Sequence, residues 1–430
     1  MKRRRFLQLT SGAGLLALGC SAARRPPPHV VCVLVDQLRQ DSFQSFATAT
    51  MGLARNGVIF DQMRSVSPWT YPSVISMMSG LLPQQHGADG FRKSRTLTTF
   101  APEVPLVSNR LRAAGWETAA FITNPFLREW NPFHIGFGKF SADFVKNLGN
   151  TRAGFHDFGI PEKMFAASVN DELRAHFDRR PVTAPEFTYV HYIDAHGPWG
   201  GAPFAPDYES AIRYVDARIA ELYSYFRRRY DDDLVFIVTS DHGQALGDDV
   251  HIGEGPQFRR MKESLHEFNV TIPFVVFGGD RVAPGRRVPF PCSNIDFAPT
   301  VLELAGLAPT VPLPGRSLWP WIGPGRAPSP PADSGTYLTV SAFGTCAEAL
   351  VWNGRKYMRH LDCATGEETA RRVFDLAADP REERPLDVDF GEAEERLREL
   401  ADPGAVRFEA GLEPISDEMA EKLRALGYVD

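Results

Sequence analysis

The chain has 430 residues, of which 43% are hydrophobic and 23% are charged. This composition allows a large core and excludes a mostly disordered chain. The 47 Lys and Arg residues against 53 Asp and Glu residues give a net charge of −6, without a basic block beyond the N-terminal tail, which excludes the broad basic surface of a nucleic-acid-binding protein. The length predicts two or three domains, or one large domain with an appendage.

Residues 1–20 are predicted to be an export signal and not part of the fold. Lys2 to Arg5 are cationic, a short uncharged apolar stretch follows, and small residues precede Cys20. This order is typical of a secretion signal, and the stretch is too short to span a membrane as a mature helix. The start resembles a twin-arginine signal, and Ala17 to Cys20 resembles a lipobox. We therefore expect a periplasmic or cell-envelope protein whose membrane contact is a lipid on Cys20.

From about residue 29 onward, short apolar runs alternate with segments of helical length. The predicted strands are His29 to Val35, Thr118 to Ile122, Phe187 to Tyr192, Leu234 to Thr239 and Ile272 to Phe277. Val104 to Ala114 and Tyr208 to Arg228 are predicted helices. Strands that are hydrophobic along their whole length are typical of a mostly parallel sheet with helices on both faces. We expect an α/β catalytic domain over residues 29–325, with ligands bound beyond the carboxyl ends of its strands.

The stretch from Arg316 to Ser334 is rich in Pro and Gly and predicts a boundary. Residues 334–430 are expected to form a small α+β subdomain with a helical tail. Its predicted strands and helices are Tyr337 to Ala342, Ala349 to Trp352, Lys356 to Arg359, Glu392 to Leu400 and Ser416 to Leu426, with a hairpin turn at Asn353-Gly354.

The cysteines of the body follow two patterns. Cys32 lies inside a β-branched run and is expected to be a buried small hydrophobic residue. Cys346 and Cys363 flank the possible hairpin, and in an oxidising compartment they could form a disulfide or remain free.

Acidic, hydroxyl and imidazole side chains follow several predicted strands. Asp36 comes directly after the first strand, Asp241 and His242 come soon after the fourth, and Thr70 lies in the segment Ser67-Pro-Trp-Thr-Tyr-Pro-Ser73. Two carboxylates and an imidazole can bind one divalent cation, which can stabilise an ester oxyanion. Thr70 is then a candidate nucleophile, because a threonine hydroxyl needs a metal or a base to react at neutral pH.

The sequence resembles the sulfatase family of the alkaline-phosphatase superfamily over about residues 29–430, which implies an alkaline-phosphatase-like fold. The matching stretches are Val31 to Asp41, Thr70 to Gly87, Thr239 to Gly243, Lys262 to Pro273, Ile295 to Gly306, Phe374 to Pro380 and Leu423 to Tyr428. The resemblance implies that Asp36, Asp241 and His242 bind the metal, and it suggests Ca²⁺. The imidazole suits Zn²⁺ or Mn²⁺ as an alternative.

The departures from the family pattern concern the nucleophile and its surroundings. Sulfatases have Cys or Ser, oxidised to formylglycine, where this chain has Thr70, and Arg where it has Val74. Oxidation of threonine gives a ketone, so the formylglycine aldehyde cannot form there. The segment is similar to superfamily members that use threonine against phosphodiesters, phosphonates or phosphoethanolamine groups. Gln37 replaces a second Asp, and Asn124 lies in a segment where many relatives have Lys and His.

The resemblance also suggests roles for further residues. His196 is expected to protonate the leaving group, and His191 to contact substrate. Lys262 is expected to bind the anionic substrate and to share in catalysis. His86 is expected to brace the turn after the nucleophile helix. Asp194 is an alternative ligand for a second metal.

Three functions follow from these observations. The first is an exported metal-dependent hydrolase of sulfate or phosphate-type esters, with a covalent intermediate on Thr70. Its substrate would be a small-molecule, glycan or lipid ester. The second is a phosphoethanolamine-type transferase that keeps the same site. The third is an inactive relative that binds glycans, for which the departures at residues 70 and 74 are the argument.

Overall fold

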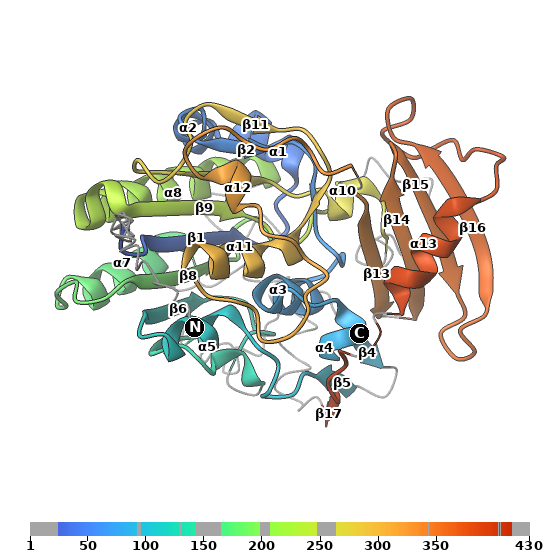
Figure 1. The fold of residues 1–430 in the computed structure, drawn as a ribbon, viewed down its shortest axis with the longest axis horizontal. Coiled ribbons are helices and arrows are strands. Elements are labelled where there is room, and N and C mark those ends of the chain that lie inside the picture. The colour runs from blue at the N-terminus through green and yellow to red at the C-terminus, as the bar shows by residue number, and fades with distance from the viewer. Residues whose placement is uncertain are drawn as a thin grey trace, which may run out of the picture.

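The computed structural model contains two large sheets and a two-stranded ladder, and Figure 1 shows the two large sheets with the helices that cover them. It describes residues 25–92, 96–128, 131–142, 165–197, 207–246, 264–332, 334–342, 344–402, 404 and 406–414. The predicted export signal, Lys262 and the predicted helix from Ser416 to Leu426 lie outside the described residues.

The first sheet has eight strands, and its central strands are those predicted from the sequence. In spatial order they are β11 (Arg286–Val288), β2 (Val58–Phe60), β10 (Phe274–Gly278), β9 (Leu234–Thr239), β1 (His29–Val35), β8 (Glu186–Tyr192), β6 (Glu117–Ile122) and β7 (Lys139–Ser141). Strands β9, β1, β8, β6 and β7 are parallel neighbours. Strand β10 is antiparallel to β9 because the chain re-enters the sheet at the edge where β9 ends, with Phe274 opposite Thr239.

Helices cover both faces of this sheet. The described helices are α1 (Gln40–Phe46), α2 (Thr48–Ala54), α3 (Thr70–Ser79), α4 (Pro83–His86), α5 (Val107–Ala113), α7 (Ala166–Phe177), α8 (Tyr208–Tyr230), α10 (Glu267–Val270), α11 (Phe297–Leu304), α12 (Trp319–Ile322) and α13 (Glu392–Ala401). Of these, α13 packs against the second sheet, on β13 (Thr336–Ala342) and β14 (Thr345–Trp352). Helices α1, α2 and α7 each contact α8, whereas α3, α5 and α11 contact one another. This arrangement confirms the predicted mostly parallel sheet between helical layers.

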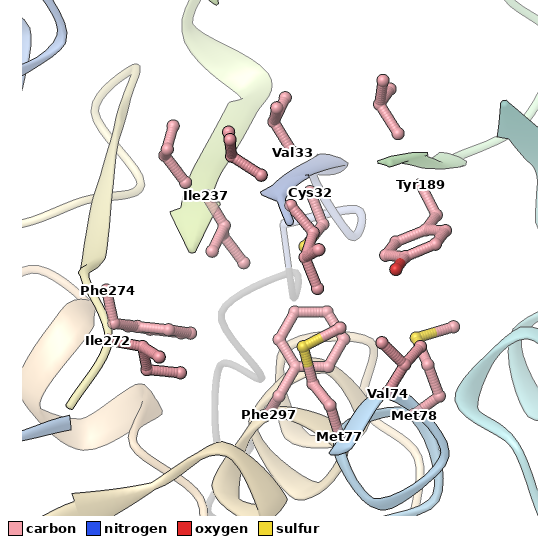
Figure 2. Packing of buried hydrophobic residues seen from close by; sticks show 14 of the residues in the cluster. Cys32, Val33, Val74, Met77, Met78, Tyr189, Ile237, Ile272, Phe274 and Phe297 are labelled. Carbon is pink, nitrogen blue, oxygen red and sulfur yellow. The ribbon is translucent and has the colours of Figure 1, made fainter. Parts of the chain in front are cut away.

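Helix α3 presents an apolar side to the centre of the sheet. Val74, Met77 and Met78 lie opposite Cys32 of β1 and Tyr189 of β8 (Figure 2). All of these side chains are buried, and each large apolar side chain removed from water contributes about 1.5–3 kcal/mol. The packing holds helix α3, which begins at the candidate nucleophile, against the two strands that end at the candidate metal site.

The second sheet takes strands from two distant parts of the chain. Its order is β16 (Glu368–Asp375), β15 (Arg355–Leu361), β14 (Thr345–Trp352), β13 (Thr336–Ala342), β4 (Gly90–Arg92), β5 (Thr96–Thr99) and β17 (Gly411–Pro414). A two-stranded ladder of β3 (Met63–Arg64) and β12 (Cys292–Ser293) completes the described strands. The sheet that the sequence assigned to residues 334–430 therefore also contains the hairpin of β4 and β5.

Several local features of the two sheets agree with the sequence. Asn353 and Gly354 both have positive φ, at 52° and 76°, as the hairpin turn between β14 and β15 requires. Cys346 and Cys363 form a disulfide with a Cα–Cα distance of 5.3 Å. Cys32 is buried and free, as expected.

Candidate active site

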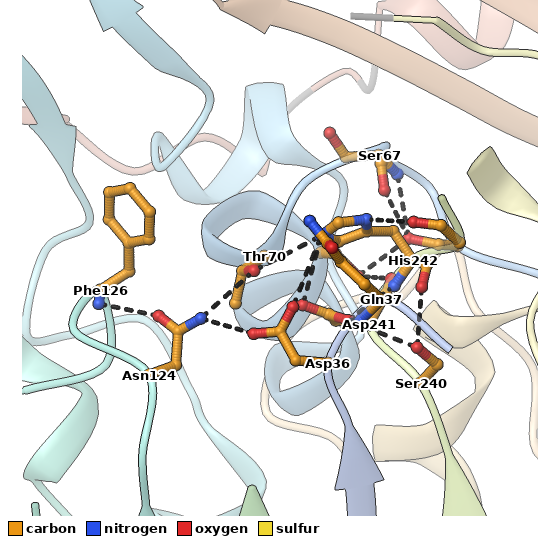
Figure 3. Close-up of polar contacts among 12 residues, drawn as sticks. Asp36, Gln37, Ser67, Thr70, Asn124, Phe126, Ser240, Asp241 and His242 are labelled. Atoms are coloured by element: carbon orange, nitrogen blue, oxygen red, sulfur yellow. Dashed lines mark hydrogen bonds and ion pairs between the residues drawn. The ribbon is translucent and has the colours of Figure 1, made fainter. Parts of the chain in front are cut away.

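The register of the central strands brings the predicted metal-binding residues to one level of the sheet. Leu34 of β1 is opposite Thr239 of β9. Asp36 and Asp241 each follow two residues later, and alternate residues of a strand lie on the same face. The two carboxylates therefore point to the same side, above the start of helix α3 (Figure 3).

Asp241 is anchored by one of its two carboxylate oxygens. Its Oδ1 accepts hydrogen bonds from the backbone N–H groups of Gln37 at 3.1 Å and His242 at 2.9 Å. Its Oδ2 is buried and has no hydrogen-bond partner. Burial and the neighbouring charge of Asp36 raise the pKa of Asp241, so a cation bound beside it would favour its ionised form.

Asp36 is held in the same one-sided way. Its Oδ2 accepts from Asn124 Nδ2 at 2.6 Å and contacts His191 Nε2 at 3.1 Å, whereas its Oδ1 is buried without a partner. Burial by itself would raise the pKa of Asp36, but the hydrogen bond from His191 and the nearby histidines hold the pKa below its usual range. Asp36 is therefore the more readily ionised member of the pair.

His242 completes the cluster. Its Nδ1 lies 2.8 Å from the Gly243 carbonyl, to which an Nδ1–H donates, so the lone pair lies on Nε2. That Nε2 lies 3.5 Å from Asp241 Oδ2 and 4.0 Å from Asp36 Oδ1. Two unpartnered carboxylate oxygens beside an imidazole nitrogen fit a divalent cation. Asp36, Asp241 and His242 are thus the residues that could hold it, as the sequence suggested.

His191 is also close enough to be considered. Asp36, His191 and Asp241 each offer a ligand atom, and these atoms lie within 4.8 Å of one another. His191 is fully buried, and its Nδ1 contacts the Tyr189 hydroxyl at 3.1 Å. The structure therefore places His191 against Asp36, whereas the sequence assigned it to substrate.

Thr70 lies at the first turn of α3 and faces this cluster. Its Oγ1 is 3.5 Å from His242 Nε2 and 3.4 Å from Asn124 Nδ2. The helix is tied to the metal-site loop, because Ser73 Oγ donates to the Asp241 carbonyl at 2.6 Å. Asn294 Nδ2 donates to the same Ser73 Oγ at 2.9 Å. The four residues Asp36, Thr70, Asp241 and His242 therefore meet at one place.

The remaining predicted residues have different positions. His196 is fully buried, and the backbone N–H of the adjacent Gly197 donates to Gln37 Oε1 at 3.4 Å, so His196 lies near the cluster. Asp194 accepts from the Ala166 backbone N–H at 3.1 Å, at the start of α7. His86 contacts Ser76 Oγ at 2.9 Å and accepts from the Ala88 N–H at 3.1 Å, which ties α3 to the following turn as expected.

Two contributions were missed by sequence reasoning. In the sequence, Asn124 stood out only because it lies where many relatives have Lys and His, yet its amide contacts both Asp36 and Thr70. It follows the predicted strand that ends at Ile122 by two residues, the spacing that identified Asp241. Gln37 adopts a left-handed backbone with φ of 59°, a strain typical of functional sites. Its backbone N–H holds Asp241, and its Oε1 accepts from the Gly197 N–H at 3.4 Å, beside His196.

Comparisons with known proteins agree with this geometry. The family model "Sulfatase" matches residues 28–307. The choline-sulfatase of Rhizobium meliloti (strain 1021) is 30% identical over 83% of this chain and 81% of its own. Arylsulfatase K of Xenopus laevis is 30% identical over 38% of this chain, which spans only 29% of that relative. The solved phosphonate monoester hydrolase of Silicibacter pomeroyi has a TM-score of 0.66 at 19% identity, covering 87% of this chain and 94% of its own.

The fold and the site define an alkaline-phosphatase-like protein with a place for a divalent metal. The chain belongs to the sulfatase family. The enzyme class that this membership supports is a sulfatase-like hydrolase of ester bonds.

Proposed function

We propose that this protein is an exported, metal-dependent hydrolase of sulfate or phosphate-type esters in which Thr70 is the nucleophile. The observation that carries the proposal is the position of Thr70 Oγ1, 3.5 Å from His242 Nε2 and beside the two unpartnered carboxylate oxygens. A divalent cation bound by Asp36, Asp241 and His242 would supply positive charge that favours the threonine alkoxide and the negative charge of the transferred group.

In the proposed first step, the Thr70 hydroxyl gives up its proton to solvent, and Oγ bonds to sulfur or phosphorus while the bond to the ester oxygen breaks. The departing oxygen takes a proton from His196, whose Nδ1 contacts the Gly197 carbonyl and is thereby oriented. In the second step a water oxygen bonds to the same sulfur or phosphorus and gives a proton to His196, while the bond to Thr70 Oγ breaks and Oγ takes a proton from solvent. Asn124 holds the hydroxyl of Thr70 and the carboxylate of Asp36 at a fixed separation. Lys262 remains a proposed contact for the anionic substrate.

The test compares the wild type with Thr70→Ala, Thr70→Ser and the control Thr188→Ala, which alters a buried threonine of β8. Each protein is assayed with an aryl sulfate, a phosphate monoester, a phosphodiester and a phosphonate, in the presence of Mn²⁺, Zn²⁺ or Ca²⁺. We expect Thr70→Ala to lose about 10³-fold or more in kcat, Thr70→Ser to retain part of it, and the control to stay near wild type. Mass spectrometry of quenched enzyme should find the sulfo or phospho group on the peptide that contains Thr70.

Full activity in Thr70→Ala would refute the nucleophile assignment. Absence of turnover with every ester and metal would instead support the glycan-binding alternative. Product that carries the transferred group on an added sugar or lipid acceptor would support the transferase.

Export and lipid attachment remain part of the proposal. Among the described residues, none of the helices is both long and apolar enough to cross a bilayer. If Cys20 carries a lipid, Cys20→Ala should release the protein from the membrane fraction.

A further inference from the structure

The two oxygens of the Asp36 carboxylate have different surroundings. Oδ2 has two partners, Asn124 Nδ2 at 2.6 Å and His191 Nε2 at 3.1 Å. Oδ1 has none, although it is buried, and it lies 4.0 Å from His242 Nε2. One oxygen is thus occupied by protein donors, while the other faces the remaining candidate metal ligands.

The sheet register explains why these partners meet. His191 of β8 is opposite Leu34 of β1 and Ile122 of β6. Asp36 and Asn124 each follow two residues after those positions, so all three side chains lie on the same face of neighbouring strands. They are fully buried, and water cannot take the place of a missing donor.

The hydrogen-bond partner of Asn124 fixes it as a donor toward Asp36, and the partner of His191 allows the same role. Asn124 Oδ1 accepts from the Phe126 backbone N–H at 2.9 Å, so its Nδ2 is the group that faces Asp36. Tyr189, two residues before His191 on the same face of β8, places its hydroxyl 3.1 Å from His191 Nδ1. When that hydroxyl donates to Nδ1, the ring hydrogen lies on Nε2 and points at Asp36 Oδ2.

We propose that His191 is a positioning residue of the metal site, and not a substrate-binding residue or a metal ligand. Its Nε2–H holds Asp36 Oδ2, and the Tyr189 hydroxyl sets the tautomer that makes this possible. Together with Asn124 it turns the carboxylate so that Oδ1 is presented to the cation. The inference rests on the proposed function only in requiring that a divalent cation binds; it does not require Thr70 to be the nucleophile.

The test measures the affinity for Mn²⁺ by calorimetry and by electron paramagnetic resonance, and the steady-state constants with the best ester substrate. The variants are His191→Leu, His191→Gln and Tyr189→Phe. The matched control is Tyr192→Phe, since Tyr192 lies on the same strand but its hydroxyl donates to Asn170. The glutamine amide can replace the Nε2–H donor of the imidazole.

We expect His191→Leu to bind Mn²⁺ about 10–100-fold more weakly, the usual cost of losing a residue that orients a metal ligand. His191→Gln should recover most of the affinity, Tyr189→Phe should lose several-fold, and Tyr192→Phe should match the wild type. The nitrogen coupling in the Mn²⁺ spectrum should be the same in His191→Gln as in the wild type, because only His242 provides a nitrogen ligand. At saturating Mn²⁺, KM should change little.

Three results would overturn the proposal. An unchanged Mn²⁺ affinity together with a raised KM in His191→Leu would show that His191 binds the substrate. Loss of nitrogen coupling in His191→Gln, with affinity as weak as in His191→Leu, would make His191 a direct ligand. If the wild type does not bind Mn²⁺, the metal site that His191 is proposed to position does not exist. If His191→Leu does not fold, Tyr189→Phe decides, because an affinity equal to that of Tyr192→Phe contradicts the proposed tautomer control. Failure of the proposed function would appear separately, as Mn²⁺ binding without ester turnover.

Discussion

Replacing Asp241 by Asn should stabilise the metal-free protein while it abolishes metal binding. The asparagine Oδ1 can keep both backbone hydrogen bonds of Asp241 Oδ1, and its amide nitrogen takes the place of the unpartnered Oδ2. The substitution therefore removes a buried negative charge next to Asp36 without removing its anchors.

The size of the effect follows from the separation of the two carboxylates. Their ligand atoms lie within 4.8 Å, and at an effective dielectric constant of about 20 two full charges at about 5 Å repel by about 3 kcal/mol. Because the raised pKa of Asp241 already relieves part of this repulsion, we expect about 1–3 kcal/mol. Unfolding entropy is about 2.1 cal/mol/K per residue, so for 430 residues the melting temperature should rise by about 1–3 °C.

The assay is thermal unfolding in EDTA and in Mn²⁺. A ligand at 100 times its Kd stabilises the folded state by about 2.7 kcal/mol, so the wild type should gain about 3 °C from Mn²⁺ and Asp241→Asn should gain none. Asp296→Asn is the control, because Asp296 is a buried carboxylate outside the site that accepts from the backbone N–H groups of Ser293 and Arg316. It should keep the full gain from Mn²⁺. An equal rise in melting temperature with Mn²⁺ in Asp241→Asn and in the wild type would refute the reasoning. A melting temperature of Asp241→Asn below that of the wild type in EDTA would also refute it.

Three further predictions concern pH, a buried ion cluster and the metal. Burial raises the pKa of Asp194 to about 7, so the folded state loses stability as pH rises from about 4 to about 7. Between pH 4 and pH 8, the free energy of unfolding of Asp194→Asn should therefore rise by about 2–4 kcal/mol relative to that of the wild type, as measured by urea unfolding. A difference between variant and wild type that is the same at pH 4 and pH 8 would contradict the raised pKa. Lys356 is fully buried between Glu267 at 2.9 Å and Glu382 at 2.8 Å. In urea unfolding, Lys356→Met should lower the free energy of unfolding by about 3–5 kcal/mol, whereas the control Arg213→Met, at an exposed ion pair, should lower it by less than about 1 kcal/mol. A similar small loss in both variants would show that the buried cluster does not stabilise the fold. After EDTA treatment, Mn²⁺ or Zn²⁺ should restore ester hydrolysis better than Ca²⁺, because an imidazole is among the candidate ligands. Higher activity with Ca²⁺ than with Mn²⁺ or Zn²⁺ would favour the calcium that the family resemblance suggests.

The central strands and the metal-site carboxylates could be predicted because their causes are local. Strands buried on both faces are continuous apolar runs, and β1 and β9 have the bounds that the sequence gives them. A polar residue one or two positions after such a run must lie where the strands end, which identified Asp36 and Asp241. The turn at Asn353-Gly354 is equally local, because its positive φ values are tolerated by few residue types.

The order and register of strands from distant parts of the chain depended on tertiary structure. Nothing near residues 90–99 predicts that β4 joins β13, about 250 residues later in the chain. The sequence assigned His191 to substrate, and only the pairing of β8 with β1 placed it against Asp36. The sequence by itself determined which side chains reach the sheet edge, because that follows from the period of each strand. Which of these side chains are in contact depends on which strands are neighbours in the sheet. Tertiary structure alone determines this order, because the packing of the whole core selects it.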